Sequence, residues 1–168
     1  MRSLHLAAHE SHAACVRLLV ECGADTEARA LGEKASELTQ SETIRATLRP
    51  ANVKHLRKTS FIKSAKEGRT WCLRLLLNAG VPADTAEGDS TALHFSALTG
   101  HLECVRLLID KNATVGARKR NGVQPLHLCA ASGKLECARL LLDKNADIDA
   151  QSDSGKAALH HCAARGCE

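Results

Sequence analysis

The sequence predicts an all-α solenoid in which short helix-turn-helix units stack and hairpin-like loops project between them. Three landmarks recur every 33 residues, namely a leucine, a histidine and a glycine (Leu93, Leu126 and Leu159; His94, His127 and His160; Gly100, Gly133 and Gly166). Residues 91–110 and 124–143 are also near-copies of each other. Self-similarity at a fixed period of this length is typical of a repeat array.

Within one unit the apolar spacing predicts two helices. Residues 92–98 form the first, Gly100 breaks it, and the second runs from Leu102 to about Lys111. Helices of about seven to ten residues are marginal in water, because nucleation costs more than so few hydrogen bonds return. We therefore expect neighbouring units to hold these helices by packing.

The loops follow from the residues that end the second helices. Gly23, Gly80, Asn112 and Asn145 are of the two residue types that accept the left-handed conformation closing a helix. The polar segments that follow in the fourth and fifth units, 113–122 and 146–155, finish on glycine, which predicts projecting hairpin-like turns.

These units resemble the ankyrin repeat. Its Thr-Pro-Leu-His-x-Ala-Ala signature is nearly whole at residues 91–97 and 124–130, and its Gly-His turn stands at Gly100-His101. The resemblance implies an ankyrin-repeat solenoid that binds proteins along its concave side and has no chemistry of its own. It also implies that the signature histidine fixes the turn before each first helix through hydrogen bonds.

The register divides the chain into repeat 1 (1–31), a degenerate or truncated repeat or linker (32–56), repeat 3 (57–87), repeat 4 (88–121), repeat 5 (122–154) and a partial repeat 6 (155–168). In the second segment, Thr39 with Glu42 predicts a capping box, and Pro50 is expected to stop the helix that follows. The first unit lacks a polar capping helix and the last has room for one helix, so we expect a part of a longer array.

Six of the eight cysteines are copies of two helix positions (Cys15, Cys72, Cys104 and Cys137; Cys129 and Cys162). We interpret these six as small buried hydrophobes in a reducing compartment. Cys22 and Cys167 fall outside the pattern and are candidates for exposed thiols. The chain has no run of 18 apolar residues and no apolar secretory signal. We therefore expect an intracellular protein, cytoplasmic or nuclear, that does not insert into membranes.

No catalytic pattern is present, because the sequence lacks a phosphate loop, a nucleophile elbow and a metalloprotease pair. The repeated histidines fall in successive layers and not around one point, so we interpret them as structural and not as metal ligands. His160, His161 and Cys162 with Cys167 make the best remaining zinc candidate, but they lack a Cys-x-x-Cys pair. We expect no enzyme activity, cofactor, metal or small-molecule substrate.

Positive charge is concentrated in the middle of the chain. Between residues 45 and 74, nine Lys or Arg stand against Glu67 alone, and Arg118, Lys119 and Arg120 form a second basic cluster at a loop tip. One interpretation is a solvated face, and the sharper one is attraction for an acidic partner peptide. Nucleic acid is disfavoured because no aromatic residues are interleaved to stack on bases.

The resemblance places partner contacts at variable positions of the first helices (Lys66, Glu67, Leu98, Thr99, Ala131 and Ser132) and at the loop tips (Asp84, Glu87, Arg118, Lys119, Arg120, Gln151 and Asp153). The sequence therefore predicts a non-catalytic protein-protein interaction scaffold. Two alternatives are the recognition arm of a larger enzyme, such as a kinase or a ubiquitin ligase, and a purely structural spacer.

Overall fold

The computed structural model describes residues 3–10, 12–30, 33–37, 39 and 41–163 of the chain. These residues are mostly helical and divide into two compact units. Unit 1 comprises Met1–Phe61 and Arg74–Val81, and unit 2 comprises Ile62–Leu73 and Pro82–Glu168. Two helices, α4 (Pro50–Glu67) and α5 (Thr70–Asn78), contribute residues to both units.

Unit 1 contains α1 (Ser3–His9), α2 (Ala13–Glu21), the two-residue strands β1 (Arg29–Ala30) and β2 (Glu33–Lys34), and α3 (Glu42–Leu48). β1 and β2 pair antiparallel, Arg29 with Lys34 and Ala30 with Glu33. Aliphatic side chains from α1 to α4 make one core (Leu4, Ala7, Ala8, Val16, Val20, Ala35, Ile44, Leu48 and Val53). Arg57 of α4 adds a hydrogen bond of 2.6 Å from its guanidinium to the carbonyl oxygen of Ala24.

The expected capping box of Thr39 and Glu42 is not formed. The N-cap of α3 is Ser41, and the Thr39 hydroxyl instead accepts the Ser41 backbone N–H at 3.1 Å. Thr39 lies two residues before the N-cap, and its hydroxyl is used in a local turn of the kind that competes with helix capping. The predicted capping box was therefore wrong, because the N-cap is Ser41 and not Thr39.

Pro50 has a double role. As expected, the preceding helix is over before it, at Leu48, but α4 begins at Pro50 itself. Proline suits the first position of a helix, because its fixed φ is already helical and its missing N–H has no partner to lose there. α4, the first helix of repeat 3, thus starts ten residues before Ser60, where the repeat pattern resumes. It runs without a break through the predicted boundary between residues 56 and 57. The division into repeats stays a prediction.

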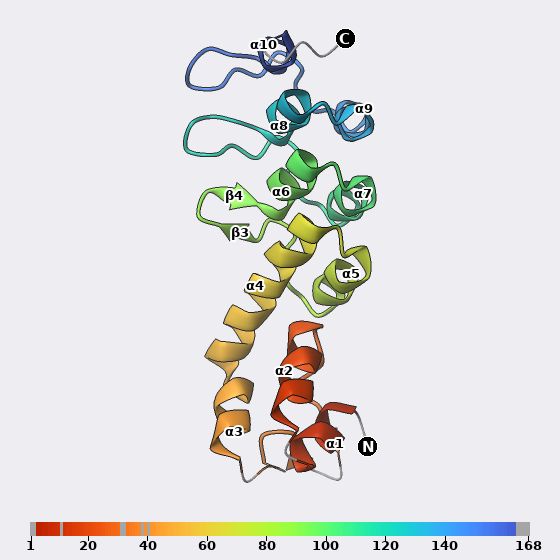
Figure 1. Ribbon diagram of the computed structural model, residues 1–168, viewed down its shortest axis with the longest axis vertical. Helices are drawn as coiled ribbons and strands as arrows, with labels where there is room; N and C mark the ends of the chain where they lie inside the picture. The colour runs from red at the N-terminus through yellow and green to blue at the C-terminus, as the bar shows by residue number, and fades with distance from the viewer. Residues whose placement is uncertain (1–2, 11, 31–32, 38, 40, 164–168) are drawn as a thin grey trace. The chain divides into compact units, whose positions relative to one another are not determined.

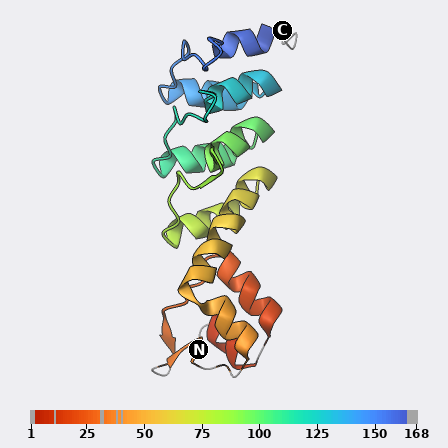
Figure 2. The ribbon, with the colours of Figure 1, turned by 90° about the vertical axis from the view of Figure 1, so that its left-hand side faces the viewer.

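Unit 2 stacks helical layers as the sequence predicts. Its first helices are α6 (Ala92–Thr99), α8 (Pro125–Ser132) and α10 (Ala158–Ala163), and its second helices are α7 (Leu102–Asp110) and α9 (Leu135–Asp143). α6 packs on α8 and α8 on α10, while α7 packs on α9. The loops project on the side away from α7 and α9 (Figure 1), and successive layers lie nearly parallel (Figure 2).

The projecting loops are hairpin-like in different degrees. β3 (Ala86–Glu87) and β4 (Ser90–Thr91) form a short antiparallel hairpin around Gly88. The fully described loops 113–122 and 146–155 contain turns but no strand. Asn112 and Asn145 precede these two loops with φ of 62° and 61°, the left-handed conformation expected of them.

In two successive layers a histidine closes its own helix cap and reaches the next loop. His94 Nδ1 accepts the backbone N–H of Thr91 at 3.2 Å, and its Nε2 donates to the carbonyl oxygen of Val123 at 3.3 Å. His127 repeats this with the N–H of Gln124 at 3.2 Å and the carbonyl of Lys156 at 3.1 Å. Because an N–H only donates and a carbonyl only accepts, both rings must be neutral with the proton on Nε2.

The capping box of Thr91 with His94 is complete, since the Thr91 hydroxyl also accepts the backbone N–H of His94. In the next repeat, Gln124 donates only its backbone N–H to His127. The Oε1 atom of Gln124 is buried without a hydrogen-bond partner among the described residues. The N-terminal cap of α6, in repeat 4, is therefore better than that of α8, in repeat 5.

The cysteine positions face the preceding layer. Cys104 Sγ lies 3.3 Å from Thr70 Oγ1 of α5, and Cys129 Sγ lies 3.6 Å from the carbonyl oxygen of Ala97 in α6. Burial raises the pKa of Cys129 to about 12, so this thiol stays neutral. The interpretation as buried hydrophobes holds at four of the six positions, Cys72, Cys104, Cys129 and Cys137.

The interpretation is wrong for Cys15, which is exposed on α2. No described element covers this face of α2, whereas a preceding layer covers the equivalent Cys104 and Cys137. Cys162 and Cys22 are half-buried, and Cys167 lies outside the described residues. Cys15, Cys72, Cys104, Cys129, Cys137 and Cys162 are free thiols.

We expect Thr91→Ala to lower the free energy of unfolding by about 1 kcal/mol, because the variant loses the hydroxyl that caps α6. Urea denaturation followed by circular dichroism measures this. Thr99→Ala is the matched control, since the Thr99 hydroxyl donates back to carbonyl oxygens of its own helix, those of Phe95 and Ser96. Equal stability of the two variants would contradict the role of the cap.

We also expect unfolding to become easier as the pH falls below about 6.5. Burial lowers the pKa of His94 below its ordinary value, so the folded chain binds this proton less readily than the unfolded chain. The contribution of His94 to the free energy of unfolding is therefore complete above its ordinary pKa. It is lost as the pH falls towards the pKa of His94 in the folded chain. His94→Gln, which keeps one acceptor and one donor without titrating, should flatten the change between about pH 7 and pH 5. An unchanged slope would contradict this.

Candidate functional site

The predicted partner-binding residues all lie in unit 2, on two adjoining features. The first-helix surface comprises Lys66 and Glu67 at the end of α4, Leu98 and Thr99 at the end of α6, and Ala131 and Ser132 at the end of α8. The loop tips comprise Asp84, Glu87, Arg118, Lys119, Arg120, Gln151 and Asp153. Every one of these thirteen residues is exposed or half-buried.

Lys66 joins the first-helix surface to the loop tips. Its ammonium group forms an ion pair with the Glu87 carboxylate and lies 4.4 Å from the centre of the Phe95 ring. A cation held over an aromatic face gains about 0.5–1 kcal/mol at exposed sites. Sequence reasoning did not select Phe95, although its position one residue after the signature His94 was a usable signal.

Neighbouring loops are hydrogen-bonded to one another. The Asp84 carboxylate accepts the backbone N–H and the hydroxyl of Thr114 at 2.8 and 2.7 Å. One loop further along, the Arg118 guanidinium pairs with the Asp153 carboxylate at 3.2 Å and donates to the Gln151 carbonyl at 3.2 Å. The tips therefore form a cross-linked row.

Asp89, which was not among the predicted residues, adds another link. Its carboxylate accepts the backbone N–H of Arg120 at 3.3 Å, and this hydrogen bond lowers the pKa of Asp89 below its ordinary value. A hydrogen bond between two main-chain groups, from the Asp153 N–H to the Asn121 carbonyl oxygen at 3.0 Å, joins this loop to the following one. The row is thus held by main-chain as well as side-chain contacts.

The first-helix surface is apolar at its centre. Leu98 is 44% exposed, and the hydroxyls beside it donate to carbonyls of their own helices, Thr99 to Phe95 at 2.9 Å and Ser132 to Leu128 at 2.5 Å. Since these hydroxyls are already satisfied internally, the exposed group with most to gain from a partner is the Leu98 side chain.

The basic clusters are partly neutralised. Arg118 is paired with Asp153, Lys66 with Glu87, Arg69 with Glu67 and Arg49 with Glu42. Exposed ion pairs of this kind contribute little to stability, but they reduce the field that a partner meets. Lys119 is half-buried, and Arg120 is the one arginine of its cluster whose side chain has no hydrogen bond or ion pair among the described residues.

The C-terminal histidines and cysteine do not converge. His160 Nδ1 accepts the N–H of Ala157 at 3.2 Å, the His161 ring lies edge-on to His127 at 5.6 Å, and Cys162 Sγ lies 3.6 Å from the carbonyl of Ala130. Across the described ranges, no group of three His, Cys, Asp or Glu is placed to hold a metal ion.

No helix in the described ranges is both long enough and apolar enough to span a membrane.

Comparison with known proteins covers nearly the whole chain. The family model described as ankyrin repeat matches residues 3–30, the one described as ankyrin repeats (3 copies) matches residues 31–119, and the one described as ankyrin repeats (many copies) matches residues 110–166. Human oxysterol-binding protein-related protein 1 is 34% identical over 99 residues, which are 56% of this chain and 10% of that protein. Ankyrin repeat protein nuc-2 of Neurospora crassa is 34% identical over 116 residues, 62% of this chain and 11% of that protein.

Rat cortactin-binding protein 2 is 39% identical over 72 residues, 42% of this chain and 4% of that protein. The chain thus spans about a tenth or less of the length of these relatives. The period of 33 residues, the histidine caps and the stacked helix pairs agree with what the family models match. The chain belongs to the ankyrin repeat family.

Proposed function

We propose that the chain is a non-catalytic scaffold that binds a partner protein on the first-helix surface and loop tips of unit 2. Ankyrin repeats are generally protein-protein interaction modules, and the matches extend over both units. The observation that carries the assignment to this surface is the cross-linked row of loop tips, from Asp84 with Thr114 to Arg118 with Asp153. A surface already held in place loses little conformational entropy when it binds.

The partner that fits this surface has an apolar anchor and a charged rim. Leu98 and the half-buried Phe95 offer the apolar contact, and the paired charges around them limit long-range attraction. Attraction for an acidic partner rests chiefly on Arg120, with Lys119 as support. Interface cores are usually apolar and ringed by polar groups, which is the arrangement seen here.

The two alternatives stay predictions. A recognition arm of a larger enzyme is compatible with relatives that are far longer than their matching segments. A purely structural spacer would show no bound partner and no salt-sensitive association. An intracellular location, in the cytoplasm or the nucleus, is likewise a prediction.

We expect Leu98→Asp to weaken partner binding at least about tenfold, because it places a charge in the apolar centre of the surface. The partner is first recovered from cell lysate with the parent chain as bait, and its affinity is then measured by calorimetry. Leu18→Asp is the matched control, since Leu18 is 59% exposed on α2 in unit 1. Equal partner affinity of the two variants would contradict the placement of the partner site at Leu98.

Charge reversal at the loop tip tests the acidic-partner proposal. Changing Arg118, Lys119 and Arg120 together to glutamate should abolish retention of an acidic partner, and Arg120→Glu alone should weaken it and reduce its dependence on salt. Arg120→Glu leaves the Arg118–Asp153 pair intact, so its effect does not come from loosened loops. Lys111→Glu, at the exposed end of α7, controls for net charge. Equal binding by Arg120→Glu and the control would contradict an acidic partner at this tip.

A further inference from the structure

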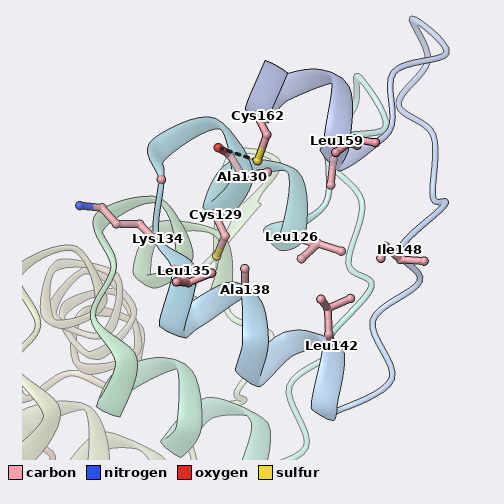
Figure 3. Close-up of a pocket in the computed structure, with 12 residues that line it drawn as sticks. Leu126, Cys129, Ala130, Lys134, Leu135, Ala138, Leu142, Ile148, Leu159 and Cys162 are labelled. Atoms are coloured by element: carbon pink, nitrogen blue, oxygen red, sulfur yellow. Dashed lines mark hydrogen bonds between the residues drawn. The ribbon is translucent and has the colours of Figure 1, made fainter. Parts of the chain in front are cut away.

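Two large apolar side chains of α5 are exposed, Trp71 by 59% and Leu75 by 46%. They are four residues apart, so they lie on the same face of this helix. At the last described layer, exposed leucines lie around a groove where a following repeat would pack, namely Leu135, Leu142 and Leu159 (Figure 3). α5 differs from this layer, because described helices both precede and follow it in the chain. The function proposed above does not use its exposed face.

The repeat offers an internal comparison for Trp71. The second helices align on their buried cysteines (Cys72, Cys104 and Cys137). In this alignment the equivalent of Trp71 is Glu103 in α7 and Glu136 in α9, and both glutamates are exposed. Since α7 and α9 stack with a glutamate at this position, stacking does not require the tryptophan. An indole left in water contributes nothing to the apolar core, which indicates another use for it.

The same difference leaves Arg74 without a partner. In α7 the equivalent residue, Arg106, forms an ion pair with Glu103 at 3.8 Å. In α5 the position of that acid is taken by Trp71, and the exposed Arg74 side chain has no hydrogen bond or ion pair among the described residues. The outer face of α5 therefore presents an unpaired guanidinium group beside the indole.

Leu75 borders a hollow in unit 1. Leu107 and Leu140, its equivalents in α7 and α9, are each 7% exposed, so Leu75 is unusually open. The guanidinium of Arg57 lies beside this hollow, and its Nε atom has no hydrogen-bond partner among the described residues. The hollow has a volume of about 400 Å³ and is lined by Leu75, Asn78 and Ala79 of α5, Arg57 of α4, and Gly23 and Asp25 after α2.

The charges near this face favour an acidic partner. Lys54 and Lys58 flank Arg57 on α4, and both are exposed without an ion pair among the described residues. Like charges at this spacing slightly destabilise a helix, so the two lysines are not there to hold α4 together. Asp25 is the acid of the lining, and its Oδ1 atom already accepts two backbone N–H groups of its own loop at 3.0 and 3.1 Å. The balance around the hollow is therefore positive.

We propose that the outer face of α5 binds an acidic, apolar segment of a partner protein. A carboxylate of the segment pairs with Arg74, as Glu103 pairs with Arg106 in α7. Apolar side chains of the segment pack on Trp71 and Leu75, and one of them enters the hollow beside Leu75. Burial of the apolar side chains gives the affinity, and the cations of α4 speed the encounter. This site is separate from the first-helix surface and the loop tips.

Two other occupants fit this face less well. A second copy of the chain that used the same face would bring its own Arg74 opposite Arg74 at the symmetry axis, where like charges repel. A flat anionic membrane that reached Trp71 would also meet Glu103 and Glu136, which are exposed at the equivalent outward positions of unit 2. A narrow protein segment can lie on α5 alone.

The probe is a library of random dodecapeptides displayed on phage. Peptides that bind the Trp71→Glu variant are removed first, and the remainder are selected on the parent chain. We expect the selected peptides to carry Asp or Glu beside Leu, Ile or Phe. Labelled with fluorescein, they should bind the parent saturably in anisotropy titrations, and Arg74→Glu should weaken this binding at least about tenfold. Arg106→Glu, at the equivalent position of α7, is the matched control and should bind them like the parent.

Trp71→Glu also separates binding from folding. It introduces the residue type that α7 and α9 carry at this position and gives Arg74 an acid three residues before it. Urea denaturation should therefore show a stability at least equal to that of the parent. A large loss of stability would show that Trp71 is structural and would overturn the proposal. Leu98→Asp should bind the selected peptides like the parent, which distinguishes this site from that of the proposed function.

Three further results would overturn the proposal. The first is a selection that yields no peptide dependent on Trp71, or yields basic peptides. The second is equal peptide binding by Arg74→Glu and Arg106→Glu. The third is evidence for another occupant, either self-association in sedimentation that Trp71→Glu abolishes, or a shift of Trp71 fluorescence to shorter wavelength with phosphatidylserine vesicles.

Discussion

The stacking of thin helical layers is the interaction on which the rest of unit 2 depends. α6 and α8 have eight residues each, too few for a stable helix in water. What holds them is burial between layers, as at Leu93, Leu108 and Leu141, which are fully buried and contribute about 1.5–3 kcal/mol each. With only 2% aromatic residues, the chain fills these layers with leucine, alanine and cysteine, and the layers are regular because the same residue types recur at equivalent positions.

Stacking also orders the surface. The hydrogen bonds of His94 to the Val123 carbonyl and of His127 to the Lys156 carbonyl join each layer to the loop of the next. The loops are then close enough for their tips to pair, as Arg118 does with Asp153. One repeated set of contacts thus builds both the core and a pre-ordered row of loops. Where no described layer follows, as beside α10, the same apolar face is left open.

Much of this could be predicted from the sequence because the repeat copies its local signals. The helices expected at 92–98 and from Leu102 are observed as α6 and α7, and the Thr91–His94 cap is formed. One error occurs where packing neighbours decide the burial of a side chain, and the other where a local turn competes with a helix cap. Cys15 is exposed because no described layer covers it, and Thr39 caps nothing because Ser41 takes that place. The pairing of Arg118 depends on which loops are adjacent, a matter of stacking that the charge pattern alone does not contain.

Amide hydrogen exchange along unit 2 tests the central claim most directly, because it reports the free energy of opening for each helix separately. If stacking holds these helices, α6, α7 and α8, which are covered by neighbouring layers, should exchange slowest and open together. α10, which packs on α8 and leaves Leu159 76% exposed, should then exchange much faster. Protection of α10 equal to that of α8, or unrelated exchange rates in α6 and α8, would contradict the account.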